Sequence, residues 1–196
     1  MKICVYGAAS NVIDKKYIDA GYELGQEMAK AGCELVFGGG ANGLMGAAAR
    51  GVKAQGGQVI GVLPELFRDG SIEILFDKCD SWIYTADMAS RKSIMETNCD
   101  AFVIAPGGIG TLDEFFGALV LKQLDVHHKP ISIFNVDGYY DKMLDLIKHC
   151  AEEKFLRENC LGLFQVFNEN EIKNMLEYLA QKEYDYTVPV SEYKYG

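Results

Sequence analysis

The sequence predicts an α/β protein of the Rossmann-like, doubly wound class, with a mainly parallel sheet and helices on both faces. Short apolar runs alternate with helical patterns along the whole chain, which is the order of elements in such folds. The apolar runs lack polar alternation, as is typical of parallel strands buried on both faces. Glycine-rich turns follow two of these runs, which favours a nucleotide-binding protein.

Each predicted strand is a short apolar run bounded by polar or turn residues. The runs are Ile3–Tyr6, Glu34–Phe37, Gln58–Leu63, Trp82–Thr85, Ala101–Ala105, Ile131–Asn135 and Phe164–Phe167.

Each predicted helix follows a strand and carries apolar residues at helical spacing, such as Tyr17, Leu24 and Met28 in the first. The helices are expected at 14–31, 44–55, from 87 onward, at 112–123, up to about Glu152, and at 169–182. Residues 65–80 are less regular and are interpreted as an active-site loop. We therefore expect a single nucleotide-binding domain over 1–182 and a polar C-terminal tail over 183–196.

Composition and charge restrict the partners. Of the 196 residues, 49% are hydrophobic and 24% charged, which is ordinary for a soluble globular protein. The net charge of −9 argues against nucleic-acid or anionic-membrane binding, which require a basic face. No apolar run approaches the roughly 20 residues that span a bilayer, and the N-terminus does not resemble a signal peptide. Six scattered cysteines without a C-x-x-C pair suit a reducing compartment, so we expect a cytoplasmic protein.

The most informative segment is Pro106–Glu114, with the sequence PGGIGTLDE, which lies between a predicted strand and a predicted helix. Strand, glycine turn and helix together expose backbone N–H groups and the positive end of a helix dipole, which favours phosphate binding. Glu114 lies one turn into that helix. Two interpretations remain open from these residues: Thr111 and Glu114 form a capping box, or Glu114 is a catalytic carboxylate near the phosphate.

The second glycine cluster, Gly38–Gly43, fits G-x-G-x-x-G between a strand and a helix. A nicotinamide-dependent oxidoreductase is therefore one alternative. It is not favoured, because the fingerprint normally occupies the first strand-to-helix turn, whereas here it follows the second strand. The sequence contains no ligand-spaced cluster of His, Cys and acidic residues, so no metal site is expected.

Arg91 and Lys92 follow the strand Trp82–Thr85 and begin near the expected ligand edge. They also fit a solvated helix face, on which Asp87 and Arg91 would form an i,i+4 pair. Spacing alone favours that second interpretation, since surface charge pairs are common.

Three ordered motifs resemble the LOG ("lonely guy") family of phosphoribohydrolases, whose members are often labelled lysine decarboxylases. The motifs are GGGxxGLMG from Gly38, MxxRK from Met88 and PGGxGTxxE from Pro106. The resemblance extends through Val136–Tyr140. It implies hydrolysis of the N-glycosidic bond of a purine nucleoside 5′-monophosphate (AMP or an N6-substituted, cytokinin-type nucleotide) to free base and ribose 5-phosphate, without a cofactor or metal, by a homodimer.

The resemblance also implies the site residues. Arg91 and Glu114 match the catalytic pair. The substrate-binding positions that it implies are Glu73, Met88, Lys92, Gly107, Gly108, Ile109, Gly110, Thr111, Gly7, Ser10, Gly39, Gly40 and Gly43. Glu114 would stabilise the oxocarbenium charge on the ribose, orient or deprotonate water, or attack C1′.

The chain departs from the family pattern beside these residues. Ala89 replaces a histidine, Ile109 an aromatic residue and Val120 a threonine. The catalytic pair is intact, so hydrolysis is the leading hypothesis, while the base preference stays open. The alternative from a different class is a non-catalytic protein that binds or senses nucleotides.

Overall fold

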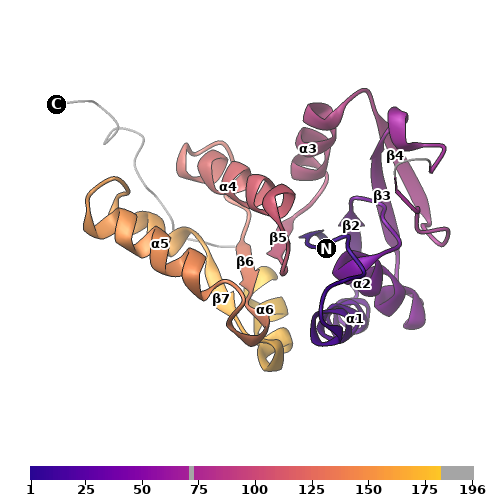
Figure 1. Ribbon diagram of the computed structural model, residues 1–196, viewed down its shortest axis with the longest axis horizontal. Helices are drawn as coiled ribbons and strands as arrows, with labels where there is room; N and C mark the ends of the chain where they lie inside the picture. Colours follow the sequence, from indigo (N-terminus) through magenta and orange to yellow (C-terminus); the bar gives the residue numbers. More distant parts are fainter. Residues whose placement is uncertain (71–72, 182–196) are drawn as a thin grey trace.

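The computed structural model describes residues 1–70 and 73–181, and it confirms the doubly wound α/β class (Figure 1). The described strands are β1 (Lys2–Tyr6), β2 (Glu34–Phe37), β3 (Val59–Pro64), β4 (Ser81–Thr85), β5 (Ala101–Ile104), β6 (Ile131–Phe134) and β7 (Gln165–Phe167). The described α-helices are α1 (Lys15–Lys30), α2 (Gly43–Ala54), α3 (Met88–Thr97), α4 (Ile109–Gln123), α5 (Asp141–Glu152) and α6 (Ile172–Leu179). The predicted tail over 183–196 lies outside the described residues.

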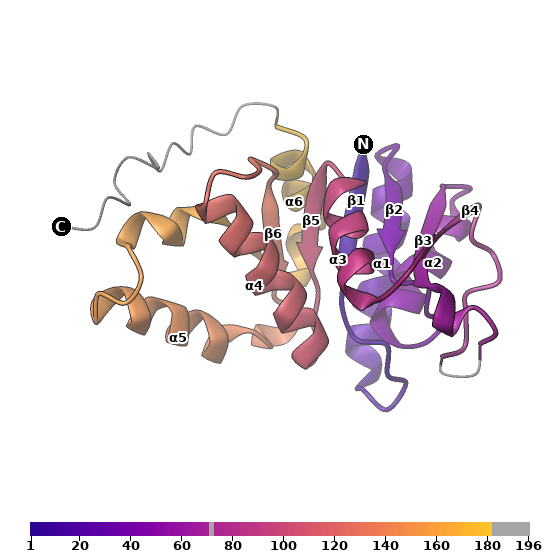
Figure 2. The same cartoon turned by 90° about the horizontal axis from the view of Figure 1, so that it is seen from above.

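All described strand pairs are parallel, and their order in the sheet is β4-β3-β2-β1-β5-β6-β7. The helices form two layers, with α1, α2 and α6 on one face of the sheet and α3, α4 and α5 on the other (Figures 1 and 2). Side chains along β1 alternate between the layers: Ile3 and Val5 pack with the first group, Cys4 and Tyr6 with the second. Because both faces are covered, the central strands can be apolar throughout.

Strands β2 to β4 are added on one side of β1, and strands β5 to β7 on its other side, so β1 pairs with both β2 and β5. The loops after β1 and β5 therefore leave the same edge of the sheet next to each other, and the Ala8 N–H donates to the Pro106 carbonyl oxygen at 2.9 Å. In open parallel sheets, this switch point is where ligands bind. The fold thus places the first loop beside the PGGIGT turn.

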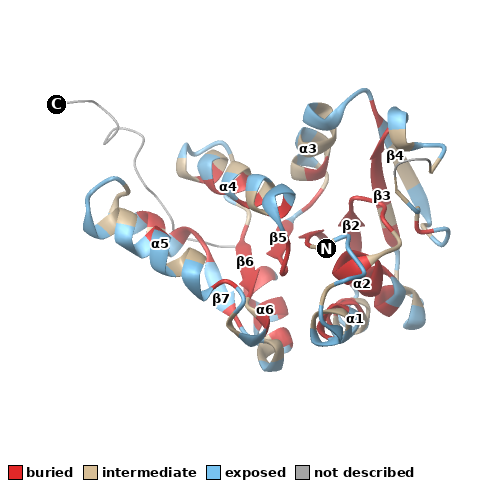
Figure 3. Cartoon of the chain, in the orientation of Figure 1, coloured by how far each residue is buried: buried red, intermediate tan, exposed pale blue. Residues whose placement is uncertain are grey.

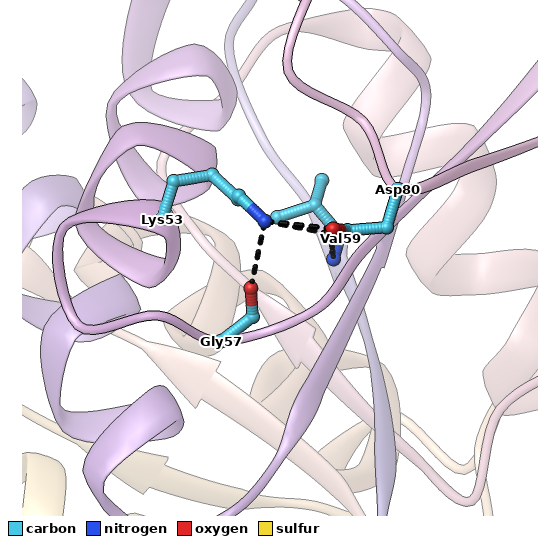
Figure 4. A network of polar contacts seen from close by, with 4 residues as sticks. All are labelled: Lys53, Gly57, Val59 and Asp80. Atoms are coloured by element: carbon cyan, nitrogen blue, oxygen red, sulfur yellow. Dashed lines mark hydrogen bonds and ion pairs between the residues drawn. The ribbon is translucent and has the colours of Figure 1, made fainter.

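Burial decreases toward the outer strands (Figure 3). Strand β5 is fully buried and β1 is buried after its first residue, whereas β4 at the edge is mostly exposed or half-buried. Asp80, just before β4, accepts bonds from Lys53 Nζ at 2.8 and 2.9 Å and from the Val59 N–H at 2.8 Å. Lys53 also donates to the Gly57 carbonyl oxygen, so this network ties the end of α2 to the start of β3 and to the entry of β4 (Figure 4).

The irregular segment 65–80 contains a short 3₁₀ helix, Glu65–Phe67, and then returns along the loop after β2. The Ala41 N–H donates to the Ile74 carbonyl oxygen at 2.8 Å, and the Phe76 N–H donates to the Gly39 carbonyl oxygen at 2.9 Å. These bonds place Glu73 next to the second glycine cluster. Among the described helices, none has the length and apolar character needed to cross a bilayer.

Candidate active site

A cavity of about 550 Å³ opens at the carboxyl edge of the sheet, between the loop after β1 and helices α3 and α4. It brings together nine of the residues singled out in the sequence: Gly7, Glu73, Met88, Arg91, Lys92, Gly108, Gly110, Thr111 and Glu114. Residues from four separate segments therefore meet at one site.

The PGGIGT turn leads directly into α4. Gly108 is the N-cap residue, without a side-chain cap, and the helix begins at Ile109. Thr111 and Glu114 thus lie inside the helix, where Thr111 is buried and packs over Gly107. The capping-box interpretation is wrong, because the glycine turn itself starts the helix two residues before Thr111. Both side chains instead line the cavity.

Glu114 is a partly buried carboxylate whose pKa is raised above the ordinary value for glutamate. Burial raises its pKa to about 7, and the positive charges of Arg91 and Lys92 counteract part of that rise. A carboxyl group that titrates near neutral pH is suited to exchange a proton or to stabilise positive charge in a reaction.

Arg91 on α3 is fixed by two backbone carbonyls, one within β3 and one just after β2. Its Nε donates to the Val62 carbonyl oxygen at 3.1 Å, and one Nη donates to the Gly38 carbonyl oxygen at 3.2 Å. The guanidinium has five N–H donors, so others remain to face a ligand. The expected surface pair with Asp87 is wrong, because the Asp87 carboxylate caps α3 at the Ser90 N–H, at 2.7 Å.

Glu73 lines the same cavity with one carboxylate oxygen, Oε1, enclosed and without a hydrogen-bond partner among the described residues. Burial raises its pKa, and Arg91 counteracts the rise. Two carboxylates with raised pKa values therefore flank one arginine, and Glu73 has an acceptor oxygen available for a ligand.

The second glycine cluster makes room for these side chains. A Cβ at Gly38 would lie 1.9 Å from an Arg91 nitrogen, and one at Gly40 would lie 2.1 Å from Glu73 Oε1. At Gly39, which has a φ of +87°, a Cβ would lie 2.6 Å from the Trp82 ring. The spacing that resembles a dinucleotide fingerprint is thus explained by packing behind the cavity.

Lys92 also lines the cavity, and its ammonium is already paired. Its Nζ lies 3.0 Å from an Asp113 carboxylate oxygen and donates to the Asp113 carbonyl oxygen at 2.8 Å. A Cβ at Gly117 would lie 2.5 Å from Nζ, so that glycine leaves space for the lysine between α3 and α4. Lys92 therefore joins the two helices that carry Arg91 and Glu114.

Six expected residues lie outside the cavity lining: Gly39, Gly40, Gly43, Gly107, Ser10 and Ile109. The first four support the walls; Gly43, for example, closely approaches the Ala8 carbonyl oxygen. Ser10 and Ile109 are exposed.

The cavity also has lining residues that the sequence did not predict as site residues, namely Ala8, Ala9, Met45, Ala89 and Asp113. The four apolar side chains carry no chemical signal, but their positions beside Gly7, Gly46 and Arg91 could have indicated them. Asp113 could have been indicated by its position next to Glu114. Among the described residues, no group of three His, Cys, Asp or Glu side chains is arranged to bind a metal ion.

Comparison with known proteins identifies the class. Residues 45–178 match the family model described as "Possible lysine decarboxylase". The chain belongs to this family, and its relatives place it with the LOG proteins.

Two plant relatives illustrate the match. The Arabidopsis thaliana "Cytokinin riboside 5'-monophosphate phosphoribohydrolase LOG5" is 35% identical over 90% of this chain and 77% of its own length. The rice "Probable cytokinin riboside 5'-monophosphate phosphoribohydrolase LOGL6" is 40% identical over 79% of this chain. The match spans only 61% of that rice protein.

Solved structures share the fold. The molybdenum cofactor carrier protein of Chlamydomonas reinhardtii superposes with a TM-score of 0.69 at 25% identity, over 92% of this chain and 98% of the carrier. The molybdenum cofactor binding protein of Rippkaea orientalis gives 0.64 at 22% identity, over 90% and 93%.

The Glu114 pKa is directly measurable. In protein with ¹³C-labelled glutamate carboxyls, we expect one signal, absent from Glu114→Gln, to titrate with a pKa of about 7. In Arg91→Ala this pKa should be higher, because a neighbouring positive charge favours the carboxylate. Arg68→Ala, which removes an arginine next to the exposed 3₁₀ segment, should leave it unchanged. An ordinary value of about 4.3 in the wild type would contradict the role assigned to burial around Glu114.

Proposed function

We propose that the protein hydrolyses the N-glycosidic bond of a purine nucleoside 5′-monophosphate, AMP or an N6-substituted analogue, and releases free base and ribose 5-phosphate. The observation that carries this proposal is the convergence of Arg91, Glu114 and the PGGIGT turn on one cavity. The names of the plant relatives support the same reaction.

Glu114 is assigned to the ribose. Breaking the bond between C1′ and the base develops positive charge on the sugar, and a carboxylate beside C1′ stabilises that charge. Its pKa of about 7 leaves a large fraction ionised at neutral pH. The carboxylate then either accepts a proton from the attacking water or itself bonds to C1′ before water displaces it.

Arg91 is assigned to the opposite charge. The departing base gains electron density as the bond breaks, and a fixed guanidinium can offset it. The bonds to Val62 and Gly38 orient the guanidinium before the substrate arrives, so little reorganisation is needed during the reaction.

The PGGIGT turn is assigned to the phosphate. Gly108 and Gly110 stand at the start of α4, and their N–H groups donate none of the turn and loop backbone hydrogen bonds among the described residues. Free N–H groups at a helix start attract an anion. Binding of the phosphate there fixes the position of C1′ relative to Glu114 and raises the rate through orientation.

The lysine decarboxylase label has little support at this site. Lys92 is the lysine that lines the cavity, and its ammonium is bound to Asp113. An amine that forms a Schiff base has to be free to lose its proton.

Replacing Glu114 tests the reaction directly. Glu114→Gln should lower kcat for AMP hydrolysis by at least about 100-fold and leave KM largely unchanged, because only the reacting carboxylate is lost. Free adenine and ribose 5-phosphate are quantified by chromatography. Glu96→Gln is the matched control, since Glu96 is a partly buried carboxylate that does not line the cavity. Tight AMP binding without base release by the wild type would favour a nucleotide-binding protein instead.

Gly38 provides a test of arginine placement. A Cβ there would overlap the guanidinium, so Gly38→Ala should displace Arg91 and lower kcat/KM by about 100-fold. Arg91→Ala should cause a similar loss, and the double variant should lose little more, because both changes remove one interaction. Circular dichroism and thermal unfolding of each variant check the fold. Additive losses would contradict this role of Gly38.

We also propose that the protein is a cytoplasmic homodimer. All six cysteines are free thiols, as expected in a reducing compartment. Helix α4 exposes Phe116 and Val120, and Leu124 follows at the same four-residue spacing, with 38%, 49% and 49% of their surface accessible. The groove that Phe116 and Val120 line shares Ala89, Lys92 and Asp113 with the cavity, so a second copy of the chain would cover an apolar face beside the site.

A charge on that face should separate the subunits. Val120→Glu is expected to shift the sedimentation coefficient from dimer to monomer, because burying an unpaired carboxylate in an interface is costly. Leu146→Glu, at an exposed leucine of α5, is the control and should stay dimeric. A monomeric wild type, or dissociation by the α5 variant alone, would contradict this interface.

A further inference from the structure

The segment Val136–Tyr140 follows β6, next to the strand that precedes the PGGIGT turn. Nothing in the reaction above uses it. Two consecutive tyrosine hydroxyls nevertheless reach the turn: Tyr139 donates to the Gly107 carbonyl oxygen at 2.7 Å, and Tyr140 donates to the Ala105 carbonyl oxygen at 2.8 Å.

With these two bonds, the three successive carbonyl groups of Ala105, Pro106 and Gly107 are all hydrogen-bonded. The Pro106 carbonyl oxygen, between the two, accepts from the Ala8 N–H at 2.9 Å. Each carbonyl from Ala105 to Gly107 therefore has a donor from another part of the chain. The tyrosines contribute the first and the third.

The orientation of a carbonyl determines the orientation of the next N–H. In a planar trans peptide, the C=O of one residue and the N–H of the following residue point in opposite directions. Fixing the Gly107 carbonyl toward Tyr139 thus fixes the Gly108 N–H toward the other side, and Gly108 lines the cavity. The Ala105–Pro106 peptide has no N–H, so the Tyr140 bond anchors the end of the strand and presents no donor.

The placement of Tyr139 depends on an unusual backbone turn. Asp137 and Gly138 both have positive φ values, 49° and 67°, which is uncommon for a residue other than glycine. Asp137 is supported by an ion pair with Lys16 of α1 and by its N–H, which donates to Glu169 at 3.2 Å. The Tyr139 ring also packs edge-on against Tyr17 of α1, with 5.6 Å between ring centroids. Several independent contacts thus maintain one hydroxyl position.

We propose that Tyr139 is a positioning residue for phosphate recognition: its hydroxyl, through the Gly107 carbonyl, directs the Gly108 N–H at the 5′-phosphate of the substrate. The inference rests on the proposed function. It predicts that removing the Tyr139 hydroxyl weakens the binding and turnover of ligands that carry a phosphate, and not those of the same nucleoside without its phosphate.

Tyr139→Phe keeps the ring and its packing and removes only the hydroxyl. We expect kcat/KM for AMP to fall by about five- to tenfold, as for the loss of one hydrogen bond. The kcat/KM for adenosine, where it is measurable, should change by less than about twofold, because the variant keeps its other contacts. Tyr178→Phe is the matched control, because its hydroxyl donates to the Ile131 carbonyl oxygen at the opposite end of the sheet. That variant should leave the ratio of the two substrates unchanged.

Binding separates this inference from the proposed reaction. Titration calorimetry with AMP and with adenosine should show the same selective loss in Tyr139→Phe, whether or not the wild type releases base. If the wild type binds AMP but does not cleave it, the proposed hydrolysis fails and the positioning role is still decided by the binding ratio. Equal losses for AMP and adenosine, or no loss for AMP, would overturn the role of Tyr139.

Discussion

The site depends above all on how one guanidinium is fixed. Arg91 reaches from α3 to the carbonyl oxygens of Val62, within β3, and of Gly38, just after the neighbouring strand β2. Gly38 follows the last residue of β2, and Val62 lies in β3 one residue beyond the last residue that pairs with β2. The guanidinium has space there because residue 38 has no side chain. The positive charge then counteracts the burial-induced rise in pKa at both Glu73 and Glu114. The fold therefore determines the electrostatics of the site through the point at which β2 ends beside β3.

Much of the architecture could be predicted from the sequence, since the alternation of short apolar runs and helical patterns is a local property. The first helix, expected at 14–31, extends over Lys15–Lys30 with Asp14 as its N-cap. The roles of the site residues were harder to predict from local sequence patterns. The T-x-x-E spacing from Thr111 to Glu114 indicated a helix cap, yet the helix begins at Ile109, because glycine turns can start a helix without a side-chain cap.

The remaining features involve contacts between distant segments. Asp87 and Arg91 have the spacing of a surface pair, but Arg91 binds carbonyls 29 and 53 residues away in the sequence. Likewise, the glycines at 38–40 have the spacing of a phosphate loop. They are required because Arg91, Trp82 and Glu73 come close to them from elsewhere in the chain. A pattern within one segment does not reveal contacts between distant segments. Here only the resemblance of the three motifs to the LOG family indicated that these residues share a site.

Fold alone does not separate a hydrolase from a carrier. The molybdenum cofactor carrier protein shares this sheet over nearly its whole length at 25% identity, so the parallel strands and the switch point are compatible with different functions. The distinction has to lie in the side chains at the carboxyl edge. A binding protein needs oriented backbone donors, which the turn at Gly108 and Gly110 can provide. It has no need for a carboxyl group with a pKa near neutral opposite a fixed guanidinium, since a partly buried carboxylate costs binding energy to an anionic ligand. The combination of Glu114 and Arg91 is therefore the feature that favours bond cleavage over simple binding.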